Sequence, residues 1–190
     1  MSKARFFVLQ LLGLLTLAAA LGWSPAARAD DYGDVNVLLR SGKLAEALAR
    51  ADLYLAAKPR DPQMRFLKGV AQTEAGRTAD AIETFSGLNQ DYPELPEPYN
   101  NLAVLYAGQS QFDKARTALE QAVRANPDYA IAHENLGDVY AKLAGLSYSK
   151  AQQLDKANAT VTPKLALIRQ LLVPAQRGSA PAIRPAGPPS

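Results

Sequence analysis

Apolar residues are distributed along the chain in three ways, and each predicts a different kind of element. Residues 6–22 form one continuous apolar run. From about residue 30 to residue 163, small and apolar residues return with a fixed period. In "KLALIRQLL", residues 164–172, leucines and an isoleucine recur at the spacing of one helix face. The pattern therefore predicts an N-terminal targeting or anchoring segment, a repeat region and a final amphipathic helix.

The period of the middle region is 34 residues. Three independent columns show it: Gly42, Gly76 and Ser110; Ala47, Ala81 and Ala115; Pro59, Pro93 and Pro127. A repeat of this length accommodates two short helices and the turn between them. Small residues let the two helices of a unit approach closely, glycine suits the turn, and proline ends the second helix. The columns predict a stack of helical hairpins.

Residues 96–129 carry a more detailed pattern, which resembles the tetratricopeptide repeat family with its W-x2-L-G-x2-Y, A-x3-F and P positions. The matching positions are Tyr99, Leu102, Ala103, Tyr106, Ala115, Leu119, Ala122 and Pro127. The preceding unit matches less well, because Lys68 and Gln72 stand where the family has Leu and Tyr. In the last unit, Ala151 and Pro163 fall two residues later than the period requires, which predicts a two-residue insertion near Gly145.

The resemblance implies an all-α fold, a right-handed helix-turn-helix solenoid of three to four units closed by a C-terminal capping helix. The expected units are about 30–61, 62–95, 96–129 and 130–163, followed by the cap at 164–172. Asp61 and Asp128 are expected to cap the helices that follow them. The final apolar stripe could instead serve as a dimerisation or partner helix, so a homo-oligomer is possible.

The N-terminal segment has the order of a secretory signal peptide: a basic start, an apolar run, and Ala-Arg-Ala before Asp30. We expect residues 1–29 to be removed on export. An uncleaved anchor is the alternative, because 17 residues of helix make about 25 Å, which is a marginal span. Residues 173–190 are rich in Pro, Ala and Gly and are expected to be a disordered tail, or a ligand for another protein.

The charge balance changes once the first 29 residues are removed. The whole chain has 21 basic and 18 acidic residues, but this segment holds three basic residues and no acidic one. Residues 30–163 are then mildly acidic, with 14 basic against 18 acidic residues, so the high pI of the whole chain does not indicate nucleic-acid binding. The absence of cysteine excludes disulfides and a lipoprotein anchor, which favours a soluble periplasmic protein.

Nothing in the sequence indicates catalysis, a metal site or a cofactor. His133 is the only histidine, and "AHENLG" lacks the second histidine that a metalloprotease helix requires. It stands in the column where the family has Trp, which favours a structural role. We therefore expect no enzyme activity, no cofactor, no bound metal and no nucleic-acid partner.

The resemblance implies that the first helix of each unit lines a concave groove that binds other proteins. The predicted partner-binding residues are Phe66, Val70, Glu74, Glu97, Asn100, Asn101, Val104, Glu134, Asn135 and Asp138. This groove is apolar in its middle and acidic at its rim, which suits a neutral or basic segment, extended or helical, with apolar anchors. The amides of Asn101 and Asn135 could bind a peptide backbone or satisfy local polar groups, and the sequence leaves both open.

These observations predict a periplasmic scaffold or assembly factor that binds a segment of another envelope protein. Once residues 1–29 are removed, no membrane contact is expected. The alternatives are a self-associating structural protein of the envelope and a non-catalytic activator of an envelope enzyme. The resemblance implies that some relatives hold a partner's C-terminal carboxylate with Lys, Arg and Asn. Here Glu97, Val104 and Asp138 stand where that site would need Lys or Asn, which argues against such a partner.

Overall fold

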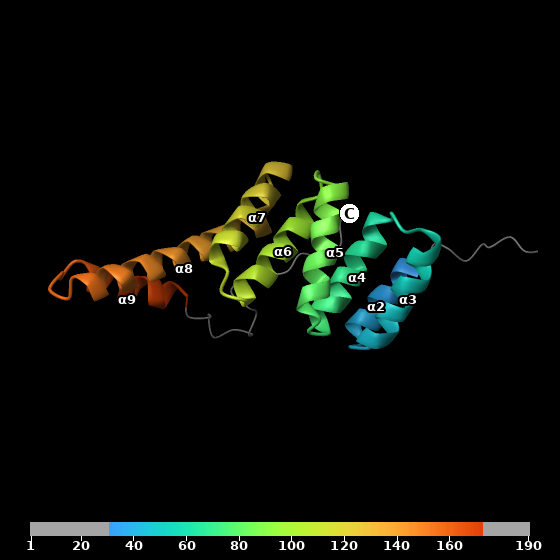
Figure 1. Cartoon of the computed structure of the whole chain (residues 1–190), viewed down its shortest axis with the longest axis horizontal. Coiled ribbons are helices and arrows are strands. Elements are labelled where there is room, and N and C mark those ends of the chain that lie inside the picture. Colours follow the sequence, from blue (N-terminus) through green and yellow to red (C-terminus); the bar gives the residue numbers. More distant parts are fainter. Residues whose placement is uncertain (1–30, 173–190) are drawn as a thin grey trace, which may run out of the picture.

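The structure is a computed structural model that describes residues 31–172, and this range contains eight α-helices and no strand. In chain order they are α2 (Asp31–Arg40), α3 (Leu44–Ala57), α4 (Pro62–Glu74), α5 (Thr78–Asp91), α6 (Pro96–Gly108), α7 (Phe112–Ala125), α8 (Ala130–Leu154) and α9 (Val161–Leu171). Each helix packs against the next one in the chain, which produces a row of hairpins (Figure 1). The predicted all-α repeat fold is confirmed. The expected signal peptide and tail lie outside the described residues.

The turn inside each of the first three units has the same backbone conformation. Gly42, Gly76 and Ser110 have positive φ angles of 68°, 72° and 59°. After each of them, the next backbone N–H donates to the carbonyl five residues earlier, at 2.8 to 2.9 Å. Such a bond satisfies a carbonyl at the end of the first helix, and it requires the left-handed conformation that glycine adopts most easily. The glycine column of the sequence is thereby explained.

The starts of the helices confirm one predicted cap and contradict the other. Asp61 precedes α4, and its Oδ1 accepts a hydrogen bond from the backbone N–H of Met64 at 2.8 Å. The prediction for Asp128 is wrong, because α8 begins one residue later and has no side-chain cap. The backbone N–H of Asp128 instead donates to Oδ1 of Asn126 at 3.0 Å.

The core consists of apolar clusters that lie between the hairpins. Ala47, Ala81 and Ala115 are fully buried, which confirms the alanine column as the close contact between helices. The space at Gly69 is the tightest of this kind, because a Cβ placed there would lie 2.7 Å from the ring of Phe85. Successive clusters share partly buried residues such as Val70, so no hairpin has an apolar core of its own. Stacking of the units therefore supplies the core.

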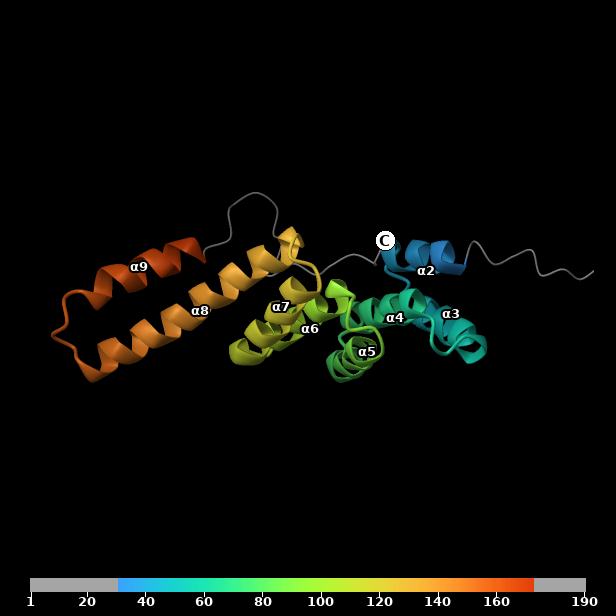
Figure 2. The same cartoon turned by 90° about the horizontal axis from the view of Figure 1, so that it is seen from above.

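The fourth unit differs from the prediction of a helical hairpin over 130–163. The chain does not turn near Gly145, because α8 continues through it as one helix of 25 residues. The turn follows Leu154, and α9 folds back along the second half of α8 (Figure 2). Gly145 allows this approach, since a Cβ there would lie 3.2 Å from Cγ2 of Ile168.

Pro163 explains part of this difference. The repeat period predicts it at the end of a unit, but it lies in the first turn of α9, which begins at Val161 rather than at Lys164. A proline lacks the N–H that the first turn of a helix leaves unpaired, so the same residue suits a helix start as well as a helix stop. The final helix packs on α8.

Candidate binding surface

The first helices of the second, third and fourth units are α4, α6 and α8, and they carry all ten predicted partner-binding residues. Six of these residues keep accessible side-chain surface: Val70, Glu74, Glu97, Val104, Glu134 and Asp138. We call these six residues the first-helix surface. On α6, Glu97, Asn101 and Val104 follow one another at intervals of four and three, which places them on one side of the helix. Four of the six accessible residues are acidic, so this surface is negatively charged.

Phe66 does not belong to this surface, and the prediction for it is wrong. Its side chain is fully buried, and its ring lies 5.6 Å from that of Phe85, measured between centroids. It packs in the cluster between the second and third units, together with Leu102 and Leu105. The repeat pattern assigned this position to the groove, but a large apolar side chain there points into the core because burial is favourable.

The asparagines form a contact between α6 and α8. Nδ2 of Asn135 donates to Oδ1 of Asn100 at 2.7 Å, and both side chains are fully buried. Asn101, the other residue of the predicted pair, is 4% exposed. The local structural role that the sequence left open is thus present for Asn135, although each amide has further donor and acceptor sites.

The starts of α6 and α8 hold two polar groups whose hydrogen-bonding capacity is unused. Oε2 of Glu97 and the hydroxyl of Tyr129 are buried and have no hydrogen-bond partner among residues 31–172. Burial raises the pKa of Tyr129, and the negative charge of Glu97 raises it further. The tyrosine therefore stays neutral, while the carboxylate is an acceptor that an N–H or cationic donor of a ligand would satisfy.

His133 lies outside the first-helix surface described above. Its side chain is exposed, and its Nε2 lies 2.8 Å from the carbonyl oxygen of Pro127 at the start of α8. Among residues 31–172, no three His, Cys, Asp or Glu side chains are grouped so that they could hold a metal ion. Within the same range, no helix is both long enough and apolar enough to cross a membrane.

Two grooves that the repeat pattern does not predict lie on the side of the second helices. One, of about 680 Å³, lies between α3, α4 and α5, and the other, of about 470 Å³, lies between α5, α6 and α7. Eight of the ten residues that line the second groove lie 34 residues after one that lines the first. The two grooves are therefore the same feature in successive repeats.

Their chemistry differs because the repeat pattern is broken in the second unit. The α4 positions are Arg65, Lys68 and Gln72, and the equivalent α6 positions are Tyr99, Leu102 and Tyr106. In the first groove, Nη1 of Arg65 pairs with Asp91 at 2.5 Å and Nζ of Lys68 pairs with Asp52 at 2.6 Å. These two cationic side chains of the first groove are thus paired within the chain, while the second groove is mainly apolar. The mismatch of Lys68 and Gln72 with the repeat pattern was the sequence signal for this difference between the two grooves.

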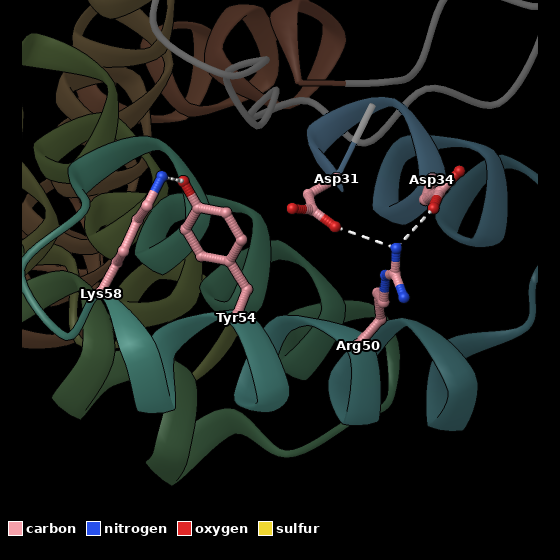
Figure 3. A network of polar contacts seen from close by, with 5 residues as sticks. All are labelled: Asp31, Asp34, Arg50, Tyr54 and Lys58. Carbon is pink, nitrogen blue, oxygen red and sulfur yellow. Dashed lines mark hydrogen bonds and ion pairs between the residues drawn. The ribbon is translucent and has the colours of Figure 1, made fainter. Parts of the chain in front are cut away.

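A polar network fastens the first helix to the second (Figure 3). Nη2 of Arg50 on α3 donates to Asp31 and Asp34 of α2, at 2.9 Å in both cases. Nζ of Lys58, the residue that follows α3, donates to the hydroxyl of Tyr54 on α3 at 3.1 Å. These groups satisfy one another, so the network is best explained as a contact that holds α2 in place.

A second part of this network reaches the third helix through Asp61. Its Oδ2 accepts hydrogen bonds from the hydroxyl of Tyr32 at 2.5 Å and from that of Tyr54 at 3.1 Å. Burial works to raise the pKa of Asp61, but the hydrogen bonds from Tyr32, from the backbone of Met64 and from Tyr54 together hold it below its usual value. The carboxylate thus stays charged and ties α2 and α3 to the start of α4.

Comparison with known proteins gives consistent results. The model of the family described as tetratricopeptide repeat matches residues 32–96 and 100–146. Among curated proteins, the chain is 34% identical over 89 residues to tetratricopeptide repeat domain-containing protein PYG7 of Arabidopsis thaliana, covering 44% of this chain and 29% of that protein. It is 24% identical over 102 residues to photosystem I assembly protein Ycf3 of Prochlorococcus marinus, covering 52% of this chain and 58% of that protein.

Solved structures show the same fold at low sequence identity. MamA superposes with a TM-score of 0.55 at 20% identity, covering 72% of this chain and 82% of MamA. TTC0263, a thermophilic TPR protein of Thermus thermophilus, has a TM-score of 0.55 at 20% identity, covering 85% of this chain and 95% of that protein. These likenesses concern the arrangement of helices.

Proposed function

Because the chain belongs to the tetratricopeptide repeat family, we propose that it is a scaffold or assembly factor of the periplasm that binds a segment of another envelope protein. Repeat proteins of this kind use extended surfaces to bind other proteins. The proposed site is the first-helix surface on α4, α6 and α8. The bound segment is neutral or basic and places apolar side chains against the middle of this surface.

One observation carries this proposal: the acidic character of the first-helix surface. Glu74, Glu97, Glu134 and Asp138 make it acidic, and Val104 supplies an apolar position between them. Oε2 of Glu97 is buried without a partner among the described residues, which costs free energy unless a donor arrives. A lysine, an arginine or the backbone N–H of a bound segment supplies that donor.

The compartment and the assembly role rest on separate observations. Residues 1–29 have the order of a signal peptide, and the chain has no cysteine for a lipid anchor. Ycf3 is described as an assembly protein, which agrees with an assembly role for a chain built of similar repeats. The chain spans less than two thirds of the curated relatives, so their activities are not transferred to it.

The proposal is tested by photo-crosslinking in intact cells. A crosslinking residue at Val104 should capture a discrete envelope protein, whereas one at Arg116 on α7 should not. Charge reversal of Glu97 and Glu134 to Lys should abolish the capture while far-UV circular dichroism shows that the helices persist. Equal capture at both positions, or capture that survives the charge reversal, would show that this surface is not the binding site.

A second candidate function is self-association, because the end of the array exposes large apolar side chains. They are Leu146 and Leu154 on α8 and Leu167 and Leu171 on α9, with exposed fractions of 56% to 76%. A contact between copies would cover them. Sedimentation measured over a hundredfold range of concentration should show a rising mass if this holds, and Leu167→Glu should then restore the monomer.

A further inference from the structure

The hairpin of α8 and α9 suggests where the chain goes after the last helix. Three contacts show which side of α8 faces α9. Gly145 lies beside Ile168, Nε2 of Gln152 donates to Oγ1 of Thr162 at 3.1 Å, and Nζ of Lys164 lies 5.7 Å from the ring centre of Tyr148. On α8 these residues are 145, 148 and 152. Intervals of three and four place them on one stripe of the helix.

The same stripe continues into the first-helix surface. Going back from Gly145 at intervals of four and three leads to Ala141, Asp138 and Glu134. The side of α8 that α9 covers near residue 145 is therefore the side that carries the two acidic residues nearer to its start. In Figure 2, α9 runs back along α8 and its end points toward the middle of the molecule.

Helix geometry gives the level at which α9 ends. Ile168 lies beside Gly145, and Leu172 is four residues further along α9, about 6 Å at 1.5 Å per residue. Because α8 and α9 run in opposite directions, Leu172 is level with about residue 141 of α8. From there, Asp138 lies about 5 Å and Glu134 about 10 Å further along the stripe.

The segment that follows Leu172 matches this surface in charge and in reach. Residues 173–190 contain Arg177 and Arg184 and no acidic residue. An extended chain with many prolines advances about 3.1 Å per residue, so Arg177 lies within about 15 Å of the end of α9. This is enough to reach both acidic residues of α8. Arg184 is seven residues further, about 22 Å, which is enough to cross to α6, since packed helices lie about 10 Å apart.

We propose that residues 173–190 lie on the first-helix surface of their own chain. Arg177 lies beside the negative charges of Asp138 and Glu134, and Arg184 lies beside the carboxylate of Glu97. The inference rests on the proposed function, because the segment would occupy the same surface that the proposed partner binds, and the partner would have to displace it. A tethered segment competes at a high effective concentration. If it covers the surface nine-tenths of the time, it lowers the apparent affinity of a partner about tenfold.

The chain is well suited to a direct test because it contains no cysteine. One variant carries Ser179→Cys and Val104→Cys, which places a thiol in the segment and another on the first-helix surface. The control carries Ser179→Cys and Arg116→Cys, with the second thiol on α7. The purified full-length protein is exposed to a mild oxidant, and intramolecular disulfides are quantified by mass. We expect the first pair to close at least ten times faster than the control.

Equal rates in the two variants would overturn the proposal. Disulfide-linked dimers in place of intramolecular bonds would also overturn it, because they would assign the surface to a second copy of the chain. A further arm tests the role of charge. Adding Arg177→Glu and Arg184→Glu to the first pair should lower its rate to that of the control, whereas Arg169→Glu, an exposed charge on α9, should not. An unchanged rate after reversal of the two arginines would contradict the predicted pairing.

Both arms use purified protein without a partner, whereas the proposed function is tested by capture in cells. A segment that does not bind leaves the capture at Val104 unaffected. A surface that captures no partner in cells can still bind the segment in the purified chain. The two proposals can therefore fail separately.

Discussion

Replacing Gly69 by alanine tests the close packing of the second unit. Gly69 lies in α4, and a Cβ added there would lie 2.7 Å from both Cε1 and Cζ of Phe85. Contacts this short do not occur between real side chains, so either the ring or the helix must move. Phe85 is 1% exposed and packs against Phe66, which leaves its ring no free space to rotate into. The added methyl group should therefore destabilise the fold.

The size of the effect follows from two opposing contributions. Forcing an extra methyl group into a packed core costs about 1–3 kcal/mol. Alanine in place of glycine within a helix stabilises by about 0.5–1 kcal/mol. The net expectation for Gly69→Ala is a loss of up to about 2.5 kcal/mol in the free energy of unfolding, with about 1 kcal/mol near the middle of the range. Urea unfolding followed by circular dichroism measures it as a lower midpoint with an unchanged slope.

The repeat supplies a matched control at Gly137, which lies 68 residues later in the same column. A Cβ there meets no atom within 4 Å, because α8 continues where a regular unit would turn into its second helix. Gly137→Ala should therefore stabilise by about 0.5–1 kcal/mol from helix propensity alone. A Gly69→Ala variant that unfolds at the same urea concentration as the parent, or at a higher one, would refute the reasoning.

The third unit shows how the clash can be relieved. It holds Ala103 and Leu119 at the positions of Gly69 and Phe85, and both side chains are buried in one cluster. Combining Gly69→Ala with Phe85→Leu should therefore cost less than the sum of the two single changes. A coupling of at least about 0.5 kcal/mol in the double-mutant cycle is expected for residues in contact.

Three further predictions concern a turn, a buried hydrogen bond and a carboxylate. Ser110→Gly should raise the free energy of unfolding by about 0.5–1 kcal/mol, measured by urea unfolding, because positive φ strains serine by about 1–2 kcal/mol and the freer unfolded chain offsets part of the gain. Asn135→Leu should lower the melting temperature, since Oδ1 of Asn100 loses this donor in a buried site, at a cost of about 1–3 kcal/mol. The pKa of Asp61 lies below its ordinary value of 3.8, so the charged carboxylate stabilises the fold above that pH, and this stabilisation is lost as the pH falls through the folded-state pKa. Asp61→Asn should therefore flatten the dependence of the melting temperature on pH in that acidic range, measured by thermal unfolding.

The first three units could be predicted from the sequence because their signals are local. A glycine at positive φ, an alanine at a helix crossing and a proline after a helix each specify the backbone near themselves, and three columns agreed on one period. The prediction for the fourth unit was wrong because its local signal is ambiguous. Pro163 suits a helix start as well as an end, and only the packing of α9 on α8 distinguishes the two.

The site was predicted less completely, because whether a residue on a first helix faces the surface or the core depends on the neighbouring unit. Phe66 and Glu134 share one column of the repeat, yet the first is buried against Phe85 and the second is exposed. The contact between Asn100 and Asn135 joins residues 35 apart, one more than the period, so aligned columns could not reveal it. Such contacts emerge only from the angle between stacked helices.

The continuity of α8 gives the molecule a mechanical property. Its 25 residues make a rod about 37 Å long, with the terminal hairpin at one end and two acidic residues of the first-helix surface near the other. Its continuous backbone hydrogen bonds make α8 stiff, so a force applied to the hairpin is transmitted along the helix to its other end. A protein tethered by its last helices would therefore carry tension directly into the proposed binding surface.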